Sequence, residues 1–225
     1  MAKGILLFSL LILSIPQAFA ENNSADFWEV SKVRVHEVAD VGGIVMTTEN
    51  SCGTSNTEPT AGNISWDEIV AIGRQFWDII VANKPVLETE TPMVHAVPKG
   101  LNCWTDLEGW KAPIARSYEV VYENKLGMEV VKFRFRLQFS YGGSHKGRGR
   151  YLANVTVLPA EVNVSWGYKF NAKLDVAQAL NMGTKADPIA ELEMNLHWNV
   201  STWIKESENS VHFSVDGNGG VRFDN

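Results

Sequence analysis

The stretch "VVKFRFRLQFSY", residues 130–141, decides the fold because apolar and polar residues alternate along it from residue 132 onward. Apolar residues hold the odd positions and polar residues the even ones: Phe133, Phe135, Leu137, Phe139 and Tyr141 against Lys132, Arg134, Arg136, Gln138 and Ser140. Successive side chains of a β-strand point to opposite faces, so the pattern predicts a long strand with one buried face and one solvent-facing face. The solvent-facing side is cationic.

The same period of two recurs on both sides of this stretch. The segments that carry it are residues 30–40, 43–49, 86–97, 117–123, 151–157, 162–170, 192–200 and 211–215. Antiparallel sheets commonly bury one face and leave the other in water, which is the pattern that these segments have. We therefore expect about eight to nine strands in a curled antiparallel sheet.

The apolar phase changes at Pro159, because Val157 has an odd number whereas Val162 and Val164 have even ones. A two-residue turn at Pro159-Ala160 would set Val157 opposite Val162 and explain the change. The sequence therefore predicts a hairpin here. A single strand bent at Pro159 is the alternative.

Residues 65–83 have helical rather than strand spacing. Ser65 is a good N-cap, and Glu68 completes a capping box three residues later. The apolar positions that fall on one helical face are Ile69, Ile72, Phe76, Ile79 and Ile80. Lys84-Pro85 then ends the helix. The sequence thus predicts an α+β fold in which the sheet packs on one embedded α-helix.

Residues 1–20 have the organisation of a secretory signal peptide. Lys3 precedes an apolar run over residues 5–15, and Ala18-Phe19-Ala20 is a small-x-small cleavage site. The run is shorter than the roughly 20 residues that a spanning helix needs, so we expect no transmembrane anchor. We predict removal of this segment and one globular domain over residues 21–225, located in the periplasm or secreted.

Net charge and cysteine content narrow the possible partners and cofactors of the protein. The formal net charge is -6, which disfavours a nucleic-acid partner. The two cysteines, Cys52 and Cys103, are too far apart in sequence for a local metal or redox motif, and an oxidising compartment favours a disulfide between them. His36, His95 and His212 are dispersed without metal-ligand spacing, so the sequence predicts neither a metal site nor a cofactor.

The cationic face of 130–141 is the first candidate site. Together with the segment "GGSHKGRGR" it could form a positive patch that binds a carboxylate, phosphate or sulfate through Arg134, Arg136, Arg148 and Arg150. The alternative is a solvated strand face whose cations are neutralised across strands by Glu161, Glu191 and Glu193. The sequence favours the second interpretation.

The solvent-facing positions of later strands carry many amides and hydroxyls, and amides offer both a donor and an acceptor to sugar hydroxyls. Asn154 and Asn163 are the candidate glycan-binding residues of this kind, with Thr156, Ser165, Asn171, Asn195, Asn199 and Ser201 on similar positions. Trp28, Trp104, Trp110 and Trp203 could add stacking faces. A plain polar sheet surface with scattered Trp is the alternative. Some of these Asn begin N-x-S/T triplets, which are glycan acceptors in a eukaryotic secretory pathway.

Catalysis has less support in the sequence, which contains neither G-x-S-x-G nor H-E-x-x-H. The best acid/base candidates are Glu191, Glu193 and His197, because period two puts all three on one strand face. Close carboxylates on a solvent-facing surface are usually just solvated, and whether the protein is an enzyme stays open.

The sequence therefore favours an exported, non-enzymatic binding or surface-interaction protein. Its partner would be a glycan, an anionic small molecule or another component of the cell envelope. A small secreted polysaccharide hydrolase that uses the Glu191 and Glu193 carboxylates is the first alternative. A structural envelope protein whose sheet edge pairs with a partner strand is the second.

Overall fold

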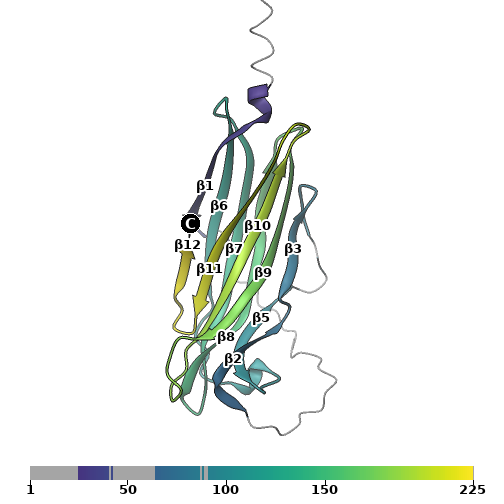
Figure 1. Ribbon diagram of the computed structural model, residues 1–225. Helices are drawn as coiled ribbons and strands as arrows, with labels where there is room; N and C mark the ends of the chain where they lie inside the picture. Colours follow the sequence, from purple (N-terminus) through teal and green to yellow (C-terminus); the bar gives the residue numbers. More distant parts are fainter. Residues whose placement is uncertain (1–24, 41, 43–63, 87, 89–90, 225) are drawn as a thin grey trace, which may run out of the picture.

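The alternating stretch lies in strand β7, Glu129–His145, of the computed structural model in Figure 1. The structure describes residues 25–40, 42, 64–86, 88 and 91–224. Phe133, Phe135, Leu137 and Phe139 are all fully buried, as the alternation predicts. The predicted solvent-facing side is wrong over its second half, where the polar residues Arg136, Gln138 and Ser140 are buried too. β7 pairs with β6, Ile114–Asn124, on one side and with β8, Arg148–Val164, on the other.

Twelve strands form two antiparallel sheets of six within the described part of the chain. The first sheet has the order β1-β6-β7-β8-β5-β2, where β1 is Val30–Val38, β5 is Val94–Lys99 and β2 is Ser65–Gly73. The second has the order β12-β11-β10-β9-β3-β4; its strands are Val221–Asp224, Glu206–Asp216, Ala190–Ser201, Lys169–Asn181, Phe76–Val81 and Lys84–Pro85. A short 3-10 helix, η1, spans Trp104–Asp106, and residues 25–28 form a helical turn.

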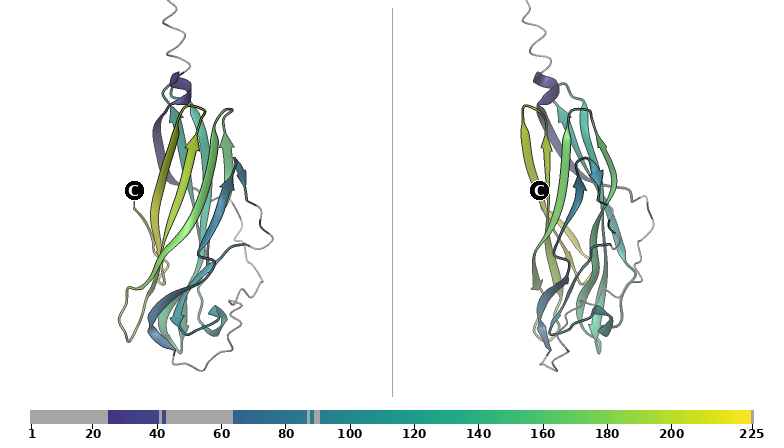
Figure 2. Two further views of the ribbon diagram at one scale, coloured as in Figure 1. Left: turned by 45° about the vertical axis from the view of Figure 1, so that its right-hand side comes forward. Right: turned by 90° about the vertical axis from the view of Figure 1, so that its right-hand side faces the viewer.

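The two sheets stack face to face, and Figure 2 shows them as two layers. Their inner faces form one core; for example, the rings of Phe133 in β7 and Phe170 in β9 lie 5.2 Å apart. The prediction of a predominantly antiparallel β protein is confirmed. The single curled sheet and the count of eight to nine strands are wrong, because the strands divide between two sheets.

The predicted embedded helix over residues 65–83 is also wrong, because this segment forms β2 and β3. Ser65 pairs with Lys99 in the sheet instead of capping a helix, and Glu68 forms an ion pair with Lys99 at 2.7 Å. The segment is rich in β-branched residues, which suit strands, and Gly73 between the strands has a φ of 98°. Bulges in both strands break the period of two, so the remaining apolar spacing imitates a helix.

The predicted hairpin at Pro159-Ala160 is replaced by its alternative, one continuous strand. β8 runs through Pro159, and the register shifts where Arg134 pairs with Glu161 but Phe135 pairs with Pro159. Ala160 is the extra residue of this bulge. One inserted residue reverses the inward-facing parity, so the phase change that suggested a turn comes from the bulge.

Several predictions concern residues outside the described ranges. The signal peptide, the strand at 43–49 and Cys52 all fall there, so export, cleavage and the Cys52–Cys103 disulfide stay predictions. In the part of the chain that the structure describes, no helix is both long and apolar enough to cross a membrane.

Candidate binding groove on the second sheet

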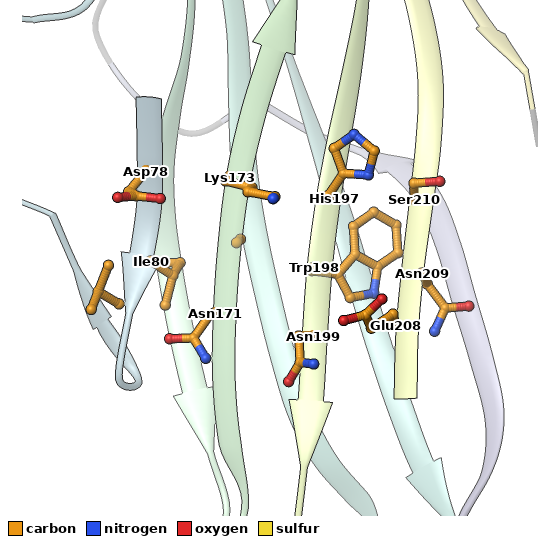
Figure 3. A pocket seen from close by; sticks show the side chains of 12 residues that line it. Asp78, Ile80, Asn171, Lys173, His197, Trp198, Asn199, Glu208, Asn209 and Ser210 are labelled. Atoms are coloured by element: carbon orange, nitrogen blue, oxygen red, sulfur yellow. The ribbon is translucent and has the colours of Figure 1, made fainter. Parts of the chain in front are cut away.

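A groove of about 510 Å³ lies on the outer face of the second sheet, across strands β3, β9, β10 and β11 (Figure 3). Each of the last three strands contributes three consecutive residues, 171–173, 197–199 and 208–210. In each triplet the middle residue belongs to the inner face; Ala172 and Trp198 are buried in the core. The outer two are polar, so the groove has a polar wall over an apolar interior.

Strand register brings the polar side chains into two rows. Lys173, His197 and Ser210 are direct neighbours across β9, β10 and β11, and Asp78 of β3 extends this row. Asn171, Asn199 and Glu208 form the second row in the same way. Figure 3 shows both rows side by side.

Three groove side chains are held by a hydrogen bond at one end. His197 Nε2 lies 2.7 Å from Asp175 Oδ1. The backbone N–H of Ala82 donates to Asn171 Oδ1 at 2.8 Å, and Asn199 Nδ2 donates to the carboxylate of Glu206. Such bonds fix side-chain orientation before any ligand arrives.

Asp175 is the centre of a chain of hydrogen bonds beside the groove. Its second oxygen accepts from Asn195 Nδ2 at 3.1 Å, and Asn195 Oδ1 lies 2.9 Å from His212 Nδ1. Because an amide oxygen only accepts, His212 Nδ1 is the donor in this pair. The chain rigidifies the sheet surface from β9 to β11.

The predicted catalytic residues separate in the structure. His197 lines the groove, whereas Glu193 accepts from Gln178 and lies 4.0 Å from His212 Nε2. Glu191 is only 1% exposed and forms an ion pair with Arg222 of β12. Neither glutamate lines the groove.

Arg134 and Arg136 lie on the outer face of the first sheet and contact acidic neighbours. Arg134 Nη2 is 2.8 Å from Glu119 Oε2, and Arg134 Nη1 is 3.4 Å from Glu161. Burial alone would raise the pKa of Glu119, but hydrogen bonds from Arg134 and from Lys132 outweigh it and lower that pKa. Arg136 bonds to Asp40 and holds the pKa of that carboxyl below its ordinary value.

Arg148 and Arg150 lie at the start of β8, next to the turn of the β7–β8 hairpin, and they also bond to groups of the same chain. Arg148 donates twice to the carbonyl of Ala186, at 3.1 and 2.9 Å. Arg150 forms an ion pair with Asp187 and donates to Asn218 Oδ1 at 3.2 Å. The four arginines thus bond to groups of the same chain. Of the three acidic partners that the sequence suggested, only Glu161 contacts one of them, because Glu191 and Glu193 belong to the second sheet.

The predicted row of amides divides between the two outer faces of the sandwich. Asn154 and Asn163 belong to β8 of the first sheet, where Asn163 Nδ2 donates to Glu161 at 2.7 Å. Asn154 has a φ of 53°, and its backbone N–H donates to His95 Nδ1. Asn171, Asn195 and Asn199 belong to the second sheet.

The tryptophans with predicted stacking roles lie away from the groove. Trp104 and Trp110 contact each other in the segment before β6, with ring centroids 5.7 Å apart. Trp28 and Trp203 meet at one end of the molecule, with centroids 6.4 Å apart. The described residues contain no group of three or more His, Cys, Asp or Glu arranged to hold a metal ion.

The sequence alone does not single out Asp78, Lys173 or Asp175 as site residues. The alternation of β9 places Lys173 and Asp175 on a solvent-facing side, but only the strand order sets β9 between β3 and β10. Asn171 and Asn199 were recognisable as outward amides. The register between β9 and β10 brings the two amides together in one groove.

Fold and groove together define a two-sheet antiparallel β-sandwich with a polar surface groove. No family model, no curated protein and no solved structure matches this chain. Its function is therefore inferred from the chemistry of its own side chains.

Proposed function

We propose that this protein is an exported binding protein that holds a neutral, hydroxyl-rich ligand, such as a glycan, in the groove of the second sheet. The observation that carries the proposal is the pair of anchored amides. Asn171 uses its oxygen to accept from Ala82, and Asn199 uses its nitrogen to donate to Glu206. This leaves a donor group on Asn171 and an acceptor on Asn199 for a ligand hydroxyl, which is both a donor and an acceptor.

The charges of the groove favour a neutral ligand over an anion. The lining residues include one lysine, Lys173, and two carboxylates, Asp78 and Glu208. The arginines that could have bound an anion make bonds to groups of the same chain. A volume of about 510 Å³ lies within the usual range for small-molecule sites.

The geometry favours binding over hydrolysis. The carboxylate pair that the sequence suggested for a glycosidase does not face the groove, because Glu191 is buried against Arg222 and Glu193 does not line it. The two carboxylates that do line the groove, Asp78 and Glu208, belong to β3 and β11 with two strands between them. Strand spacing puts them roughly 14 Å apart, which is farther than the carboxyl pair of a glycosidase. Ser210 is the strand neighbour of His197, yet no hydrogen bond joins their side chains among the described residues. β10 is paired on both sides, so its backbone N–H groups are committed to the ladders and form no oxyanion hole.

The test is binding to an array of neutral oligosaccharides, followed by titration calorimetry with the best soluble one. The double variant Asn171→Ala with Asn199→Ala should bind about tenfold to a hundredfold more weakly, because it loses two ligand hydrogen bonds. Asn163→Ala, an exposed amide on the other sheet, is the matched control and should bind like the wild type. Unchanged affinity in the double variant, or no array signal above background for the wild type, would refute the proposal.

A further inference from the structure

One end of the sandwich collects the exposed apolar side chains. Three turns meet there: residues 125–128 between β6 and β7, 165–168 between β8 and β9, and 202–205 between β10 and β11. The helical turn at 25–28 joins them, and Figure 1 shows this end at the top of the molecule, next to the purple N-terminal turn. We call these four segments the aromatic tip.

The large apolar side chains of the tip are unusually exposed to solvent. Trp166 is 85% and Trp203 76% exposed. Nine large hydrophobic side chains of the described residues are exposed, and five of them belong to the tip: Leu126, Met128, Trp166, Trp203 and Ile204. Single exposed apolar residues are normal, but a cluster of this kind marks an interaction surface.

Ring packing and ion pairs hold the segments of the tip together. Trp28 packs over Gly167, where a Cβ would lie 2.2 Å from the Trp28 ring and φ is 83°. The ring of Trp28 contacts those of Trp166 and Trp203, with centroids 5.9 and 6.4 Å apart. Glu29 ties two of the turns together through Lys125 at 2.7 Å and Lys205 at 3.2 Å.

The ring orientations decide between two kinds of partner. Trp28 is inclined by 55° to Trp166 and by 79° to Trp203, so the rings form no flat platform on which successive sugars could stack. Binding to a bilayer interface does not require a flat platform of rings. Trp is enriched at such interfaces, because its apolar ring and its polar N–H suit the headgroup boundary. The four segments belong to both sheets at one end of the long axis, so one flat surface can meet all of them (Figure 2).

The route of the chain points to the same partner. The described chain begins at Ala25, in the tip itself. In the sequence, only residues 16–24 separate it from the apolar run at 5–15. Until the predicted removal of residues 1–20, a leader held in the membrane would therefore keep this tip close to the bilayer.

We propose that the aromatic tip inserts into the interface of a lipid bilayer, with Trp166 and Trp203 as the anchoring side chains. The flanking charges are of both signs, with Asp26, Glu29, Glu129 and Glu206 against Lys125, Lys169 and Lys205. Binding is therefore driven by apolar burial, needs no anionic lipid and responds little to salt.

The test is co-sedimentation of the exported protein with phosphatidylcholine vesicles, with Trp emission as a second signal. We expect binding with a blue-shifted emission, unchanged by added salt. Trp166→Ser and Trp203→Ser should each lower the partition coefficient about tenfold. Phe76→Ser with Met182→Ser removes exposed apolar side chains outside the tip and should bind like the wild type.

Three outcomes would overturn the proposal: no vesicle binding by the wild type, equal binding by the Trp166→Ser, Trp203→Ser double variant, or equal loss in the Phe76→Ser, Met182→Ser control. Sedimentation equilibrium without lipid adds an independent check. Self-association that the tip substitutions abolish, without vesicle binding, would make the tip a contact between copies of this chain. Loss of vesicle binding with an unchanged thermal melt excludes unfolding as the cause.

Discussion

Trp198 Nε1 donates to the hydroxyl of Tyr122 at 2.6 Å, deep between the two sheets. Trp198 belongs to β10 and Tyr122 to β6, so this bond joins one sheet to the other. Asn209 Nδ2 of β11 donates to the same hydroxyl at 2.8 Å. Because Trp198 lies between His197 and Asn199, the bond also positions the floor of the groove.

Tyr122→Phe should destabilise the protein by about 1–3 kcal/mol, since it leaves the Trp198 donor without its acceptor inside the core. Asn209 loses one of its two acceptors and keeps Ser207 Oγ. Urea unfolding followed by far-UV circular dichroism measures this change.

Tyr118→Phe is the matched control for that substitution. Tyr118 is also buried and also in β6, but its hydroxyl makes no hydrogen bond to another described residue. We expect a change within about 0.5 kcal/mol. Equal losses in the two variants would mean that the Tyr122 hydroxyl has no special role.

Arg136→Gln should lower stability by about 2 kcal/mol, because the Arg136 side chain is only 10% exposed and is the cationic partner of Asp40. The same variant, and Arg134→Gln, should elute from an anionic matrix at nearly the wild-type salt concentration. A stable variant that elutes much earlier would instead assign these arginines to ligand binding.

His95 makes stability depend on pH. Its ring is fully buried and stacks on Trp104, and this burial lowers its pKa to about 4. The folded pKa is below the unfolded value near 6.5, so the folded state binds the proton less readily than the unfolded state. The contribution of neutral His95 to the free energy of unfolding is therefore fully present above pH 6.5 and is lost as the pH falls toward 4. Between pH 7 and pH 5 the loss should be about 2 kcal/mol.

His95→Gln supplies the control for the pH experiment, because Gln can still accept the N–H of Asn154 and does not titrate. Its unfolding free energy, measured in urea at pH 5, 6 and 7, should vary less with pH than that of the wild type. Parallel pH curves for the two proteins would show that another group causes the loss.

Reduction should weaken the protein if Cys103 is bridged to Cys52, as the sequence predicts. Loop entropy assigns such a bridge about 4 kcal/mol. Adding dithiothreitol should therefore lower the melting temperature of the wild type, and Cys103→Ser should show the same loss without reductant. An unchanged melt, when thiol titration finds two reactive cysteines, would remove the disulfide.

Strand-forming segments were predictable wherever the pleat stayed regular. β10 keeps one buried side and one partly exposed side along its central part, and its periodicity was sufficient. In β7 the apolar side is buried as predicted, but the polar side is covered as well at Arg136, Gln138 and Ser140. The helix predicted over residues 65–83 and the turn predicted at Pro159 were wrong because β-bulges change the period of the apolar pattern locally. A bulge depends on the partner strand, which the local sequence does not contain. The division into two sheets is a tertiary property, so no local pattern contained it.

The candidate site was predictable only in parts. His197, Asn171 and Asn199 were visible as outward polar residues, but their alignment with Asp78 and Lys173 follows from strand pairing between distant segments. Glu191 has outward parity and is nevertheless buried, because Arg222 of the C-terminal strand lies against it. Parity alone therefore does not predict exposure where a side chain from another strand covers the residue.

The most direct test of the central claim is a heteronuclear NMR titration of the labelled protein with the best neutral oligosaccharide from the array. Binding in the groove predicts backbone shift changes centred on the lining residues 78, 80, 81, 171–173, 197–199 and 208–210. Changes centred on β7 and β8, or at the aromatic tip, would contradict the account and move the ligand to another surface.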